Sequence, residues 1–98
     1  MSVRNLLVLN HHCSSHGISM RQLALLTVLT DGLIRPCDLA KRLYISPAAI
    51  TGQLDSLEHK GYIERKLLAD RRAIAIHITD TGRNLIHQAE LLTGQVAA

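Results

Sequence analysis

The segment NHHCSSHG, residues 10–17, concentrates the side chains that could bind a metal ion. It holds His11, His12, Cys13 and His16 within six positions. Imidazole nitrogen and thiolate sulfur are donors that zinc accepts in tetrahedral sites. His12, Cys13 and His16 are therefore the candidate metal ligands, but the other histidines are scattered and do not complete a four-ligand shell. The pattern favours a solvated loop between two helices, and we expect neither a metal nor another cofactor.

The positive charge lies in a different segment, residues 60–72. The whole 98-residue chain carries a net charge of +3, and this segment alone has the same excess, because it holds five basic and two acidic residues. The basic residues are Lys60, Arg65, Lys66, Arg71 and Arg72. Such a local excess is typical of a surface that binds nucleic acid. Charge alone is equally consistent with an ordinary solvated face.

The residues before this basic segment predict two helices joined by a tight turn. Pro36 opens the first helix, CDLAKRLYI. Ser46 can cap the second, and Pro47 suits its first position, where no backbone donor is needed. Gly61 is a favourable residue to end that helix. Two helices joined by so short a turn predict a helix-turn-helix at about residues 36–60.

The second helix of this pair has an apolar face and a face of small residues. At about 100° per residue, Ile50, Leu54 and Leu57 point inward and Gly52 points outward. Glycine inside a helix costs about 1 kcal/mol relative to alanine. Its outward position indicates a close approach to DNA, and the alternative is that it avoids a clash with a neighbouring helix. Because recognition helices read bases with their N-terminal residues, the candidate DNA contacts are Ser46, Pro47, Ala48, Ala49, Thr51, Gly52 and Gln53.

After Gly61 the sequence changes from a helical to an alternating period. The segments YIERKLL and AIAIHIT flank a polar tip, ADRR, and isoleucines alternate at positions 74, 76 and 78. This pattern predicts a β-hairpin at about residues 62–79. We expect Arg71 and Arg72 to reach a minor groove and Asp70 to hold an arginine by a charge-assisted hydrogen bond. The candidate contacts of the hairpin are Arg65, Lys66, Asp70, Arg71 and Arg72.

The remaining segments complete a single domain over residues 1–98. Residues 3–9 predict a short helix, Ser19 and Gln22 a capping box at the start of a second, and Thr79 the cap of a last helix. The order predicts an α+β winged helix-turn-helix fold, mostly helical with a small antiparallel β-hairpin wing.

Both terminal segments, 1–15 and 80–98, are expected to build a homodimer. An exposed apolar stripe on a monomer would be a liability, and pairing of two copies would cover it. The dimerisation candidates are Val3, Leu6, Leu7, Leu85, Ala89, Leu92 and Val96.

Several classes of protein are not expected. No apolar stretch approaches the roughly 18–20 residues that span a membrane, so we expect a cytoplasmic protein with no membrane partner. Cys13 and Cys37 are too few for a disulfide framework. The carboxylates are scattered and no phosphate-binding glycine loop is present, so we do not expect an enzyme.

From about Ser19 to Ile86 the chain combines four motifs: LAxxL, DxLExxGxIxR, DRR and ITxxG. Together with the serine cap and Thr51, this combination resembles the MarR family of bacterial winged-helix regulators. The resemblance implies a homodimeric repressor that binds a pseudo-palindromic duplex. It also implies a major-groove surface made by Ser46, Ala48, Ala49, Thr51 and Gly52, and a wing in which Asp70 pairs with Arg72 in the minor groove.

The chain departs from the family pattern in two ways. Many relatives have arginine at the positions of Gly52 and Ser56, so we expect limited base readout from this helix. Relatives usually have longer terminal helices, with a pocket for small phenolic effectors between them and the DNA-binding lobe. We expect that pocket to be absent or shrunken here. Because relatives include metal- and thiol-responsive members, a regulatory site in residues 10–17 stays an alternative.

Two other functions stay open at this point. One is an accessory or partition protein of a plasmid or phage that binds DNA at clustered repeats. The other is a winged helix that binds proteins and not DNA, which the weakly basic recognition helix supports and the basic hairpin opposes.

Overall fold

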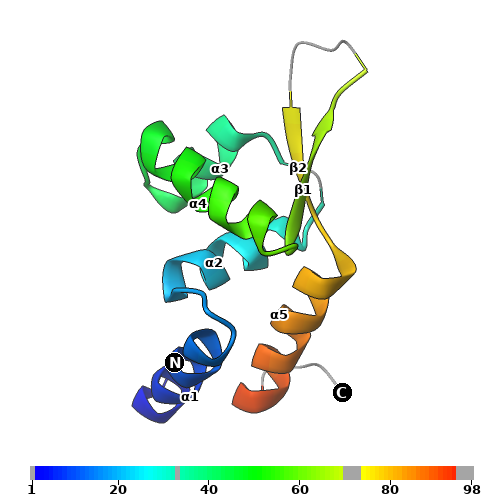
Figure 1. Cartoon of the computed structure of the whole chain (residues 1–98). Coiled ribbons are helices and arrows are strands. Elements are labelled where there is room, and N and C mark those ends of the chain that lie inside the picture. The colour runs from blue at the N-terminus through cyan, green and yellow to red at the C-terminus, as the bar shows by residue number, and fades with distance from the viewer. Residues whose placement is uncertain (1, 33, 70–73, 95–98) are drawn as a thin grey trace.

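The computed structural model describes residues 2–32, 34–69 and 74–94. The elements are α1 (Val3–Ser15), α2 (Met20–Leu29), α3 (Pro36–Leu43), α4 (Pro47–His59), β1 (Ile63–Leu67), β2 (Ile74–Ile78) and α5 (Asp80–Thr93). Figure 1 shows α3 and α4 beside the hairpin, α2 beneath them, and α1 and α5 together at the other end. The predicted order of elements is confirmed, and the fold is a winged helix-turn-helix. No helix in the described ranges is long and apolar enough to cross a lipid bilayer.

The hairpin has a third, very short partner at its root. β1 and β2 pair antiparallel, with Ile63 opposite Ile78 and Arg65 opposite Ile76. Ile34 then forms an isolated bridge to Ile76, in which the Ile76 N–H donates to the Ile34 carbonyl at 2.8 Å and the Ile34 N–H donates back at 3.3 Å. The segment between α2 and α3 is thereby tied to the hairpin, which positions the helix-turn-helix against the wing.

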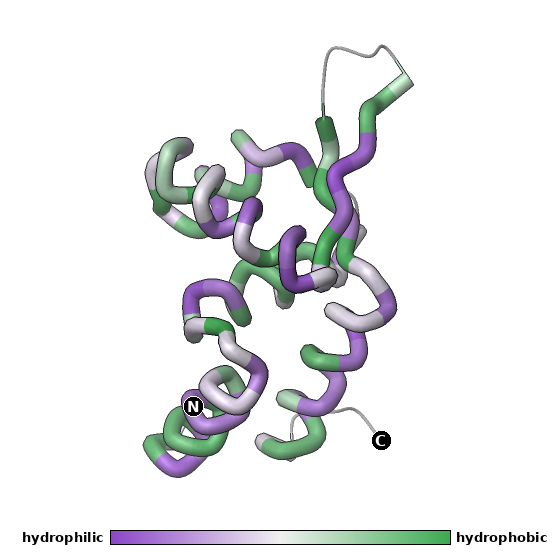
Figure 2. Tube along the Cα trace, viewed as in Figure 1, coloured by the Kyte–Doolittle hydropathy of each residue, from purple (hydrophilic) through white to green (hydrophobic). Residues whose placement is uncertain are grey.

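Helix α2 lies at the centre of the core. Leu25, Leu26 and Leu29 are fully buried, and α2 contacts α1, α3, α5 and β2. Figure 2 shows its apolar residues in green between the helix-turn-helix and α5. The predicted capping box starts this helix, because Ser19 accepts from the Gln22 N–H and the Gln22 side chain accepts from the Ser19 N–H. This central helix joins the two halves of the domain.

The prediction that residues 10–17 form a loop is wrong for most of the segment. Helix α1 continues through it to Ser15, and Gly17 follows with a left-handed φ of 70°. Asparagine, serine and histidine carry only modest helix penalties. Burial of Leu9, His12 and Cys13 on one face of α1 outweighs those penalties.

The expectation that Leu85 and Ala89 face a partner subunit also fails, because both side chains belong to the core of the single chain. They are 3% and 6% exposed, respectively. Residue Val96 lies outside the described part of the chain. The exposed large apolar residues of α1 and α5 are Val3, Leu6, Leu7, Leu91 and Leu92. Only part of the predicted dimerisation set is therefore on the surface.

Gly82 is the glycine at which the chain packs most closely. A β-carbon at this position would lie 2.7 Å from Cγ1 of Ile78 and would also overlap the carbonyl oxygen of Tyr62. That carbonyl accepts a hydrogen bond from the Thr79 N–H at 3.0 Å, so it is held in place. The missing β-carbon lets α5 begin directly against the hairpin.

Gly82→Ala should lower the free energy of unfolding by about 1–3 kcal/mol, because the added methyl group overpacks a rigid backbone contact. Urea denaturation followed by circular dichroism measures this. Gly52→Ala is the matched control, since a β-carbon there meets nothing within 4 Å. The control should be more stable than the parent by up to about 1 kcal/mol. Equal effects of the two substitutions would contradict the close packing at Gly82.

Candidate nucleic-acid interface

The N-terminal turn of α4 forms an exposed surface. The hydroxyl of Ser46 accepts from the Ala49 N–H at 3.2 Å, and Pro47 occupies the first helical position. The Thr51 hydroxyl donates to the Pro47 carbonyl at 3.0 Å, which uses its hydrogen within the helix. Of the predicted contacts, Ser46, Pro47, Ala48, Thr51 and Gly52 are exposed, and Ala49 and Gln53 are half-buried.

The opposite face of α4 is buried in the core. Ile50, Leu54 and Leu57 are at most 1% exposed, as the helical projection predicts. Gly52 lies on the outward side, where a β-carbon would meet nothing within 4 Å. Avoidance of a clash with another helix of the same chain therefore does not explain this glycine. The helix backbone at Gly52 is therefore open to close approach from outside the chain.

Tyr44 is an exposed aromatic residue at the turn between α3 and α4, a position that the sequence alone does not single out. It ends α3 with φ 54° and ψ 43°, a left-handed conformation, and it is 97% exposed. This conformation costs a non-glycine residue roughly 1–2 kcal/mol. The turn then reverses the chain, with the Ile45 N–H donating to the Ala40 carbonyl at 3.1 Å. An aromatic ring thus stands two residues before the cap of α4.

The side chain of Arg65 reaches from β1 to α4 and is half-buried there. Its Nη1 is 2.6 Å from Oε1 of Glu58, and its Nη2 is 2.7 Å from Oδ1 of Asp55. The Arg65 N–H also donates to Oε2 of Glu58 at 3.3 Å. Burial by itself lowers the pKa of Arg65, but the hydrogen bonds to Asp55 and Glu58 outweigh it and leave the pKa above its ordinary value. The guanidinium braces the hairpin against the recognition helix.

Some basic side chains of residues 60–72 therefore make contacts within the chain, and others are exposed to solvent. Arg65 is bound to α4, and the Lys60 ammonium donates to the Gly17 carbonyl. Lys66 is exposed on β1. The predicted wing contacts Asp70, Arg71 and Arg72 lie outside the described residues, so their placement stays a prediction from the sequence.

Two of the three candidate metal ligands, His12 and Cys13, are used in packing. His12 is buried, and its Nε2 lies 3.1 Å from the Leu85 carbonyl, which can only accept, so Nε2 donates. Cys13 is 1% exposed, and its thiol donates to the Met20 sulfur at 3.6 Å. Burial raises the pKa of the Cys13 thiol, which disfavours the thiolate that metals bind. His16 is exposed, with its ring 4.6 Å from that of His12. Across the described ranges, no three potential ligands converge.

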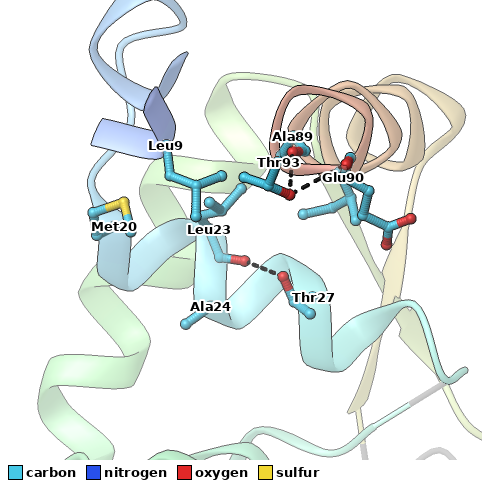
Figure 3. A pocket seen from close by; sticks show the side chains of 9 residues that line it. Leu9, Met20, Leu23, Ala24, Thr27, Ala89, Glu90 and Thr93 are labelled. Carbon is cyan, nitrogen blue, oxygen red and sulfur yellow. Dashed lines mark hydrogen bonds between the residues drawn. The ribbon is translucent and has the colours of Figure 1, made fainter. Parts of the chain in front are cut away.

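A pocket of about 270 Å³ lies between α1, α2 and α5 (Figure 3). The sequence predicts that an effector pocket is absent or shrunken in this chain, and that expectation stays a prediction. The volume is near the lower end of small-molecule sites. Its lining residues are Leu9, Met20, Leu23, Ala24, Thr27, Ile86, Ala89, Glu90 and Thr93.

Comparison with known sequences gives one family. The MarR family profile matches residues 18–74. The HTH-type transcriptional repressor YetL of Bacillus subtilis is 33% identical over 85 residues, which cover 83% of this chain and 51% of YetL. The chain spans about half the length of this curated relative.

Comparison with solved structures gives the same fold. Wild-type MarR of E. coli in its apo form superposes with a TM-score of 0.80 at 30% identity, covering 94% of this chain and 70% of MarR. A mutant of E. coli MarR in complex with operator DNA superposes with a TM-score of 0.81 at 29% identity, covering 94% and 67%. Both support the assignment of α4 and the hairpin as the winged-helix elements.

Arg65→Ala should lower the free energy of unfolding by about 0.5–1.5 kcal/mol, because two charge-assisted hydrogen bonds are lost at a partly solvated site. The loss should shrink at high salt, and Asp55→Asn should reduce it in a double-mutant cycle. Lys66→Ala changes an exposed neighbour on the same strand and should have little effect. The brace is wrong if Arg65→Ala and Lys66→Ala are equally stable.

Proposed function

The chain belongs to the MarR family, and we propose that it is a sequence-specific DNA-binding regulator that represses transcription in the cytoplasm. The observation that carries this proposal is the exposed N-terminal face of α4 around Gly52. A helix can enter the major groove, which is about 12 Å wide, and read bases there with its N-terminal residues. Small side chains at Ala48 and Gly52 allow the backbone to approach the bases closely. The proposed activity is binding and involves no catalysis.

The printed names of the relatives support this role. YetL is a transcriptional repressor, and the E. coli MarR mutant was crystallised with operator DNA. We propose that this chain likewise represses transcription and binds operator DNA, because it has the helices and strands that form the winged helix.

The wing is proposed to supply the second set of contacts. Arg72 would enter the minor groove, where narrow A·T-rich stretches attract arginine, and Asp70 would hold it in position. Lys66 is exposed on β1 and is available for a phosphate. Because the exposed face of α4 has no arginine or lysine before Lys60, guanine readout by this helix is weak. Phosphate and wing contacts therefore contribute much of the affinity, which makes binding strongly dependent on salt.

A test begins with selection of bound sequences from a random pool of duplex DNA. On the selected duplex, Gly52→Leu should weaken binding at least about tenfold by blocking the close approach. Its thermal midpoint should not fall, because the position is open and leucine favours a helix over glycine. Arg72→Ala should weaken binding to all duplexes and reduce the slope of log K against log salt by about 1. Clustered repeats among the selected sequences would favour the accessory or partition role. No binding to any duplex at low salt would contradict the proposal in favour of a protein-binding winged helix.

We further propose that the protein acts as a homodimer through α1 and α5. Leu7 and Leu92 are 64% and 55% exposed, and both line a shallow depression between the two helices. Val3 and Leu6 extend this apolar surface along α1. A second copy would bury it and would place two α4 helices on the two half-sites of a pseudo-palindrome.

The double substitution Leu7→Glu with Leu92→Glu should convert the dimer to a monomer, because it places four carboxylates in the interface. Sedimentation velocity at micromolar concentration measures the state. Leu67→Glu is the matched control, since Leu67 is 66% exposed on β1 and belongs to neither α1 nor α5. A monomeric parent protein would contradict the proposed homodimer. A variant that stays dimeric after the double substitution would contradict the interface through α1 and α5.

A further inference from the structure

Tyr44 is a large aromatic residue whose ring makes almost no contact with its own chain. It is 97% exposed, whereas the chain's other tyrosine, Tyr62, is half-buried and packs against the core. The backbone of Tyr44 is left-handed, with φ 54° and ψ 43°, a conformation that is unfavourable for a residue with a β-carbon. Glycine is the common residue at such a helix end. The ring thus contributes little to the fold, and a glycine would suit the turn better.

The turn between α3 and α4 holds the backbone of Tyr44 in one place. The Tyr44 N–H donates to the Lys41 carbonyl at 3.4 Å, and the Ile45 N–H donates to the Ala40 carbonyl at 3.1 Å. Leu43 and Ile45, on either side, are partly buried and pack against the core. Their inward anchoring leaves the Tyr44 side chain directed into solvent, as its exposure shows. The phenol is therefore presented to a partner by a backbone that is already ordered.

Tyr44 lies beside the first turn of α4. It is two residues from Ser46, which limits the distance between their Cα atoms to about 7 Å. Ser46, Pro47 and Ala48 are exposed and belong to the proposed major-groove surface. The edges of a major groove are sugar-phosphate backbones, and the first helix of a helix-turn-helix crosses a backbone when the second lies in the groove. The end of α3 that carries Tyr44 should therefore meet a phosphate.

The charges at this end of α3 also favour a phosphate. Lys41 and Arg42 are exposed in the last turn of the helix, and Asp38 lies in its first turn. Arg42 is 3.8 Å from Asp31, with both side chains largely exposed, so solvent screens this pair strongly. A phenol hydroxyl has one hydrogen to donate, and tyrosine is among the side chains that bond phosphate oxygens in protein–DNA complexes. The partner that fits Tyr44 and its two basic neighbours is an anionic oxygen.

We propose that the phenol hydroxyl of Tyr44 donates a hydrogen bond to a phosphate at the edge of the major groove that α4 enters. The contact positions α4 and reads no base, because phosphate contacts fix the register of a protein on the duplex without carrying sequence information directly. This inference rests on the proposed DNA-binding function and adds to it a residue outside α4 and the hairpin. It also accounts for a tyrosine in a left-handed turn.

Two substitutions separate the hydroxyl from the backbone conformation. Tyr44→Phe should weaken binding to the selected duplex at least about threefold, as expected for one lost hydrogen bond, with an unchanged thermal midpoint. Tyr44→Gly should weaken binding at least as much and should raise the thermal midpoint by a few degrees, because glycine adopts the left-handed conformation without strain. A loss of affinity together with a gain in stability cannot come from damage to the fold. Tyr62→Phe removes the other phenol and, as the matched control, should bind DNA as the parent does.

The dependence of binding on salt and on single phosphates identifies the contact. The slope of log K against log salt should be the same for Tyr44→Phe as for the parent, since a neutral phenol releases no counterion, whereas Arg72→Ala should reduce it by about 1. Duplexes with a methylphosphonate at one position of each half-site replace a charged phosphate by a neutral group. At one such position beside the bases that α4 contacts, the parent and Tyr44→Phe should bind nearly equally.

The outcomes separate this contact from the DNA-binding function as a whole. A parent protein that binds no duplex would overturn both. If the parent binds and Tyr44→Phe binds equally well, only the Tyr44 contact is overturned. It is also overturned if no methylphosphonate position removes the difference between the two proteins, since the hydroxyl then acts on another group. A lower thermal midpoint of Tyr44→Gly would contradict the external role of the ring.

Discussion

Burial of the leucine face of α2 is the constraint on which the rest of the structure depends. Leu25, Leu26 and Leu29 are fully buried, and the chain has no phenylalanine or tryptophan to replace them. Each such side chain contributes about 1.5–3 kcal/mol by leaving water. Because α2 contacts α1, α3, α5 and β2, the same burial orients the helix-turn-helix, the hairpin and the terminal helices relative to one another.

The recognition helix and the hairpin are joined more directly than through the core. Arg65 on β1 binds Asp55 and Glu58 on α4, so the strand that leads to the wing tip is anchored on the helix that presents Gly52. On β2, Ile76 pairs with Ile34, which joins the segment before α3 to the hairpin. β1 and β2 are therefore tied both to α4 and to the segment before α3. For the proposed DNA-binding function, these contacts would fix the spacing between the major-groove and minor-groove contacts.

The histidine-rich segment shows how chemistry-bearing residues can serve packing. His12 donates across to the Leu85 carbonyl of α5, and Cys13 packs on Met20 of α2. A buried polar group is tolerated when its hydrogen bond is made, and here that bond holds the two terminal helices together. These contacts lie beside the apolar pocket, at the end of the domain that the second copy of the proposed homodimer would cover.

The sequence by itself determined the order of elements, the caps at Ser19 and Ser46, and the inward and outward faces of α4. These features depend on the local spacing of capping and apolar residues, since side chains return to the same face every 3.6 residues in a helix and every 2 residues in a strand. The helical state of residues 10–15, the burial of Leu85 and Ala89, the brace by Arg65 and the contact at Gly82 were decided only by the tertiary structure. Each depends on a partner from a distant part of the chain, and distance along the chain does not encode which surfaces meet. From the sequence, Arg65 is a candidate DNA contact. The carboxylates of Asp55 and Glu58 that bind it lie on α4, which only folding brings beside β1.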